Sequence, residues 1–127
     1  MFARAATAYR RVDLDSAPKG EIVARLFARC LDDIARAREA IAGKDIAAKS
    51  AAIDHALRIV IELRAALDHQ AAPALAANLD GLYLFVHDQL SLANVNLAGA
   101  PLDAAARVMS ELGAAFAAVK HEPAAAP

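Results

Sequence analysis

Residues 75–97 read LAANLDGLYLFVHDQLSLANVNL, and this stretch decides the fold class. Apolar side chains recur in it at intervals of three and four residues, which is the period of one face of an α-helix. The pattern predicts a helix whose apolar stripe packs into the core of a helical bundle. The stripe consists of Leu75, Leu79, Leu82, Val86, Leu90, Ala93 and Leu97.

The sequence on either side predicts three more helices. Apolar positions follow a helical period from Ile22 to Ile41, and Ile46, Ile53, Val60 and Leu67 recur every seven residues. A further apolar face runs from Leu102 to Val119. The predicted helices cover 18–42, 45–70, 73–98 and 101–120.

Prolines and glycines mark the predicted helix ends. Pro18, Pro73 and Pro101 suit first turns, and Gly43 and Gly99 suit the positions where helices stop. Asp45 is the expected cap of the second helix, and Ser16 is a candidate cap of the first. Connections of a few residues force neighbouring helices to run in opposite directions. We therefore expect an all-α, antiparallel, up-and-down four-helix bundle over residues 18–121, with an N-terminal arm over 1–17 and a disordered tail over 122–127.

Composition supports one helical domain. The chain has 127 residues, of which 58% are apolar and 5% aromatic, with no tryptophan. Much of the apolar fraction is alanine, which favours helices and adds little core volume. A β-sandwich would need more β-branched and aromatic residues. The composition predicts a thin aliphatic core.

Charge and cysteine content point to a cytoplasmic protein. The net charge is −1, so no global field attracts nucleic acid. No apolar run approaches the roughly 20 residues that a membrane span needs. The single Cys30 cannot form an internal disulfide, and the first residues do not resemble a secretion signal. We expect no nucleic-acid partner and no membrane span.

The residue pattern offers little chemistry. Among the histidines, His55 and His87 project onto polar helix faces, and no inward Glu-x-x-His pair is present for a di-metal site. Cys30 lies on an apolar face, where a thiol is inert. We predict no catalytic residue, no metal site and no cofactor. An all-helical enzyme built around Arg64, which projects onto the apolar side of its helix, is kept as a minor alternative.

The third predicted helix has more apolar surface than a bundle core needs. Besides its core stripe it carries Leu84, Phe85, Leu92 and Val95 on nearly the opposite side. Gly81 leaves space there and Asp88 interrupts the patch. Ile59 and Leu63 widen the apolar arc of the preceding helix. These six apolar residues are the candidate lining of a groove for an amphipathic partner segment.

Two other interpretations of the surplus remain open. A helix that touches two neighbours in the same bundle has a wide apolar face, which would explain Ile59 and Leu63. A homodimer would cover the patch equally well. From the residue pattern alone, a monomeric binding module and a self-associating bundle are evenly matched.

Several segments, in order, resemble a known family. Residues 78–83 (NLDGLY), followed by Leu90 and the pair Ala93-Asn94, resemble the N-L-x-x-L-Y segment and later A-N pair of the flagellin-specific export chaperones, FliS. Residues 41–46 (IAGKDI) and 59–67 (IVIELRAAL) are similar to that family's junction and second-helix motifs. Phe27 stands where the family usually has tyrosine, and Phe116 where many members have tryptophan.

The resemblance implies a function and a partner. It implies a cytoplasmic chaperone that binds the C-terminal region of flagellin, prevents premature polymerisation and helps deliver it to the flagellar type III export apparatus. It also implies an N-terminal arm in which Tyr9, with Val12 beside it, covers part of the binding surface in the free protein. The predicted state is a monomer or weak homodimer, with the export gate as a second partner.

Overall fold

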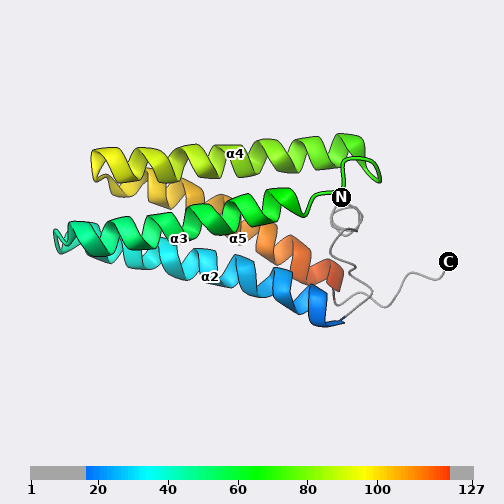
Figure 1. The fold of residues 1–127 in the computed structure, drawn as a ribbon, viewed down its shortest axis with the longest axis horizontal. Helices are drawn as coiled ribbons and strands as arrows, with labels where there is room; N and C mark the ends of the chain where they lie inside the picture. The colour runs from blue at the N-terminus through cyan, green and yellow to red at the C-terminus, as the bar shows by residue number, and fades with distance from the viewer. Residues whose placement is uncertain (1–16, 121–127) are drawn as a thin grey trace.

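Four α-helices account for the described part of the chain, residues 17–120 of a computed structural model. They are α2 (Ala17–Ala42), α3 (Ile46–Ala65), α4 (Pro73–Asn96) and α5 (Gly99–Lys120). Consecutive helices run in opposite directions along one long axis (Figure 1). The predicted all-α up-and-down bundle is confirmed. The expected tail and residues 1–16 of the expected arm, including Tyr9, Val12 and the candidate cap Ser16, lie outside the described residues.

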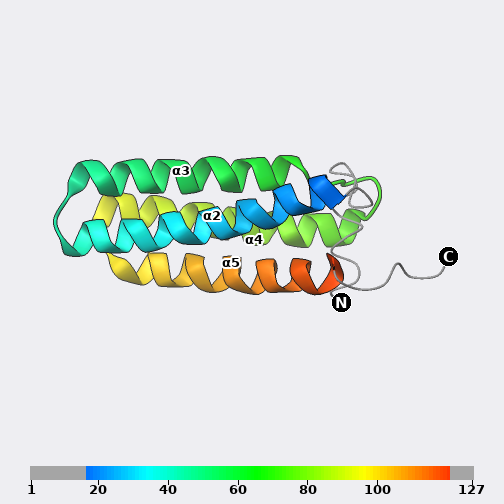
Figure 2. The same ribbon diagram turned by 90° about the horizontal axis from the view of Figure 1, so that it is seen from below.

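The helices form a closed ring. α2 packs on α3 and α5, and α4 packs on the same two helices from the other side (Figure 2). The α2–α3 turn and the α4–α5 connection lie at one end of the bundle, while the α3–α4 connection lies at the other (Figure 1). None of the described helices is both long and apolar enough to cross a bilayer.

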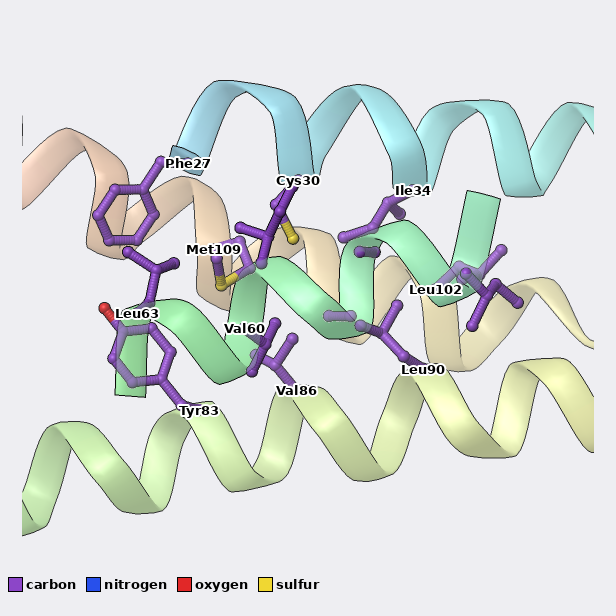
Figure 3. Packing of buried hydrophobic residues seen from close by; sticks show 14 of the residues in the cluster. Phe27, Cys30, Ile34, Val60, Leu63, Tyr83, Val86, Leu90, Leu102 and Met109 are labelled. Carbon is purple, nitrogen blue, oxygen red and sulfur yellow. The ribbon is translucent and has the colours of Figure 1, made fainter. Parts of the chain in front are cut away.

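All four helices contribute to one buried core. Figure 3 shows Leu63, Tyr83 and Val86 pointing inward between the helices, with Cys30 and Met109 on the facing elements. The rings of Phe27 and Phe116 lie with centroids 6.1 Å apart in a tilted arrangement, which joins α2 to α5. Tyr83 is fully buried although it lies outside the predicted core stripe.

The turn after α2 differs in one detail from its prediction. Asp45 caps α3 as expected, because its Oδ1 accepts a hydrogen bond of 3.0 Å from the Ala48 backbone N–H. The backbone N–H groups of Asp45 and Lys44 bond to the carbonyls of Ala40 and Ile41, which makes a Schellman turn. In that turn Lys44 takes the left-handed conformation, with φ 57°, and not Gly43.

Two other helix ends also lie elsewhere than expected. α3 ends at Ala65, not near 70, because the Asp68 side chain accepts from the Gln70 and Ala71 backbone and forms a separate turn. α4 ends where Leu97 adopts φ 54°, and Gly99 begins α5. The prediction that Gly99 ends this helix was wrong.

Some positions expected in the core are exposed. Leu82 lies at the flank of the inner side of α4, where no neighbouring helix covers it fully. Ile46 begins α3 and Leu97 caps α4, so both sit at the end of the bundle beyond the packed stripe. Ile22, in the first turns of α2, is exposed at the opposite end. An apolar stripe in the sequence identifies the inner side of each helix, but it does not show which residues of the stripe the neighbouring helices bury.

We predict that the thiol of Cys30 does not react in the folded protein. Burial, with a smaller effect from the Asp33 carboxylate, raises its pKa from the usual 9.0 to about 12. At pH 8 this lowers the thiolate fraction about a thousandfold, and the thiolate is the reactive form. A chromogenic disulfide reagent should label Cys30 only in denaturant. Rapid labelling of the native protein would contradict this placement.

Candidate partner-binding surface

The side of α4 that faces away from the bundle carries a row of apolar side chains. Leu84, Phe85, Leu92 and Val95 are between 41% and 80% exposed, as their helical positions predict. The core of the bundle is filled from the other side of the same helix by Tyr83 and its neighbours. We call this exposed row the α4 outer face.

Two of the six predicted groove residues lie elsewhere. Ile59 and Leu63 are at most 4% exposed, and Figure 3 shows Leu63 pointing into the core beside Tyr83. The reason is the position of α3 between α2 and α4, because contact with both neighbours uses its whole apolar arc. Their placement on an outer groove was wrong, and they are core residues.

Ile61 is an exposed apolar residue that the sequence pattern did not predict at the surface. Its side chain is 52% exposed although it lies in an otherwise buried apolar run. Ile61 is three residues before Arg64 on α3, and Leu84 is four residues after Asp80 on α4, so each lies one turn from a paired residue. Ile61 and Leu84 are both exposed, and because Arg64 and Asp80 bind each other across antiparallel helices, each lies one turn from this pair, at the α3–α4 seam.

The Arg64–Asp80 pair fixes that seam. Arg64 Nε lies 2.7 Å from Asp80 Oδ1, and Nη2 lies 3.4 Å from Oδ2. The hydrogen bond from Arg64 holds the pKa of the Asp80 carboxyl below its usual 3.8. Arg64 therefore points along the surface toward a carboxylate, which explains the feature on which the enzyme alternative rested.

The two helical glycines that interrupt α4 and α5 differ in their surroundings. A Cβ added at Gly113 would lie 3.3 Å from the Phe27 Cβ, so close helix packing explains that glycine. A Cβ added at Gly81 would meet no atom within 4 Å. Glycine in a helix costs about 1 kcal/mol of stability relative to alanine. No contact within residues 17–120 requires a glycine at position 81.

The remaining polar candidates are held in pairs. His55, expected to face solvent, is half exposed and its Nδ1 pairs with the buried carboxylate of Asp33 on α2. His87 Nδ1 lies 3.8 Å from Asp88 Oδ1. Within residues 17–120, no three His, Cys, Asp or Glu side chains gather in a way that could hold a metal ion.

Comparison with known proteins decides the family. A family model described as "Flagellar protein FliS" matches residues 2–123. The chain belongs to the FliS family. A FliS relative from Vibrio cholerae serotype O1, named "Flagellar secretion chaperone FliS", is 30% identical over 113 residues, which cover 86% of this chain and 83% of the relative. The match takes in all four described helices, α4 among them.

We expect the Arg64–Asp80 pair to add modestly to stability and to lose that contribution in acid. A double-mutant cycle with Arg64→Met and Asp80→Asn should give a coupling of about 1 kcal/mol or less at pH 7, because both side chains are partly exposed. The folded-state pKa of Asp80 is depressed, so the coupling is present above pH 4 and disappears as the pH falls through that lower pKa. Urea unfolding at pH 7 and pH 2 measures both values. No measurable coupling at pH 7, or a coupling that grows as the pH falls, would contradict the pairing.

Proposed function

We propose that this FliS-family chain is a cytoplasmic flagellar secretion chaperone that binds the C-terminal region of flagellin. In this role it prevents premature polymerisation and helps deliver flagellin to the flagellar type III export apparatus. The observation that carries the proposal is the α4 outer face, an exposed apolar row on a helix whose other side already fills the core. Membership in the FliS family, and a relative named a flagellar secretion chaperone, support a flagellar export partner for this surface.

The geometry of the α4 outer face suits an amphipathic segment. Leu84 and Val95 are eleven residues apart, which is three helical turns, and Phe85 and Leu92 are seven apart, which is two. The row thus runs along the helix axis, as in complexes where a helix lays its apolar side into a groove. Asp88 is exposed within the row and can pair with a basic or hydroxyl side chain of the partner. Gly81 allows a close backbone approach.

Binding alone is enough for the proposed role, so we propose no catalytic step and no cofactor. A flagellin segment that is disordered before binding loses conformational freedom when it folds on the bundle, which lowers the net affinity. Moderate affinity favours release at the export gate. That an N-terminal arm with Tyr9 and Val12 covers part of this surface in the free protein remains a prediction.

Self-association is the alternative that the same surface supports. A second copy could bury its own α4 outer face against the first, as two-fold dimers do. Such a dimer would hide the surface from flagellin. The two functions therefore predict different responses to the same substitution.

We expect Leu84→Asp and Leu92→Asp each to weaken binding of the flagellin C-terminal segment at least tenfold. Both side chains are more than 40% exposed, so a charge there leaves the fold intact but must be desolvated in the complex. Isothermal calorimetry measures the affinity and circular dichroism the helicity. The matched control is Ile22→Asp, an equally apolar exchange at an exposed residue on α2.

Four outcomes would count against flagellin binding by this surface. Wild-type affinity in both α4 variants would mean that flagellin binds elsewhere, and equal losses in Ile22→Asp would mean that α4 has no special part. Loss of helicity would mean that the two leucines belong to the core. Light scattering that detects a dimer only in the wild type would favour self-association.

We predict that Gly81→Ala raises stability and lowers flagellin affinity. Alanine in a helix is about 1 kcal/mol more favourable than glycine, and the new methyl group meets no atom of the described bundle. The same methyl group stands in the way of a close partner. Gly113→Ala is the control, since crowding against Phe27 should reduce its gain and its position in the bundle should leave binding unchanged. Unaltered affinity in Gly81→Ala would place the partner away from Gly81.

A further inference from the structure

A hollow opens at the end of the bundle where the α2–α3 turn meets the end of α4. Its volume is about 440 Å³, within the range of sites that hold a small ligand or a few side chains. Figure 1 shows the α2–α3 and α4–α5 connections together at this end. We call it the end pocket. It is lined by Ala40, Ile41, Lys44, Ile46, Lys49 and Leu97.

Lys49 brings a buried positive charge to the end pocket. Only 5% of Lys49 is exposed, and its Nζ donates to the backbone oxygen of Asn94 at 3.1 Å and to Oδ1 at 2.7 Å. No carboxylate of residues 17–120 lies within 4.0 Å of this ammonium group. An ammonium has three N–H donors, so one remains after the two bonds to Asn94. Buried charges are usually paired, and this one is paired with neutral groups only.

Backbone strain gathers at the same place. Among the described residues, the non-glycine residues with positive φ are Lys44, at 57°, and Leu97, at 54°, and both line the end pocket. Both residues stand at helix C-termini, where left-handed backbone is common, and a side chain in this conformation costs about 1 kcal/mol or more relative to glycine. Lys44 therefore lines the end pocket at a turn position where glycine would be more stable.

The rest of the end pocket is apolar. Ile41 is partly covered, while Ile46 and Leu97 are about half exposed. An occupant must therefore present an apolar side chain to these residues and an anionic group to Lys49 and Lys44. Both requirements meet within one residue at the C-terminus of a polypeptide, where an α-carboxylate is attached directly to the carbon that bears the side chain.

We propose that the end pocket binds the C-terminal residue of a partner polypeptide, with its free carboxylate on Lys49 and Lys44 and an apolar side chain against Ile46 and Leu97. The pocket uses none of the residues of the α4 outer face. The proposal therefore stands or falls separately from flagellin binding by that surface. The end pocket would then be a second recognition site, specific for the free C-terminus of a polypeptide.

The test is an NMR titration of the full ¹⁵N-labelled chain with acetyl-Gly-Ser-Gly-Ser-Leu-Leu. One peptide carries a free C-terminal carboxylate and its partner carries a C-terminal amide. The free acid should shift the backbone signals of Ala40, Lys44 and Leu97, and the amide should bind at least tenfold more weakly, since a charge-assisted bond to Lys49 is lost. Equal binding of the two peptides, or no shift at these signals with either, would overturn the proposal.

Two variants sharpen the test. Ile46→Asp should weaken free-acid binding at least tenfold, whereas Ile22→Asp should leave it unchanged, because Ile22 has nearly the same exposure (52% against 53%) but lies at the other end of α2 from the pocket. Lys44→Gly should raise the thermal midpoint by relieving the strained turn and should still weaken the free acid at least threefold. Wild-type affinity in both Ile46→Asp and Lys44→Gly would show that the peptide binds elsewhere.

Discussion

Burial of the inner side of α4 is the constraint on which the rest of the structure depends. Tyr83, Val86 and Leu90 fill the centre of the bundle, and burying each such side chain contributes about 1.5–3 kcal/mol. In the ring, α4 packs mainly on α3 and α5, so the side of α4 away from these two helices faces outward. Since that side also carries Leu84 and Val95, the packing that stabilises the fold necessarily presents an apolar surface to a partner.

Polar links set how the helices are aligned once the core is formed. Arg64 with Asp80, and Lys49 with Asn94, tie α3 to α4 at two well-separated levels. Arg38 pairs with Asp103 between α2 and α5. Links at two levels oppose sliding and rotation of α4 against α3. They keep the outer face turned away from the core and bring Lys49 to the end pocket.

Helical period was sufficient to predict the bundle, because the fold class depends only on which side of each helix is apolar. It could not decide between a core side chain and a surface one on α3, where Ile59 and Leu63 are buried and Ile61 is exposed. That distinction depends on how two neighbours share one apolar arc, which is a property of the assembled bundle. The end pocket was not predictable either, since the left-handed Lys44 stands beside a glycine that suits the same turn.

The central claim is that one side of α4 builds the bundle and the other binds flagellin. Methyl NMR of the labelled chain with an unlabelled flagellin C-terminal segment tests it most directly. The account predicts intermolecular contacts to the methyl groups of Leu84, Leu92 and Val95, with Val86 and Leu90 keeping their contacts inside the bundle. Contacts confined to other helices, or loss of the internal contacts of Val86 and Leu90 on binding, would contradict it.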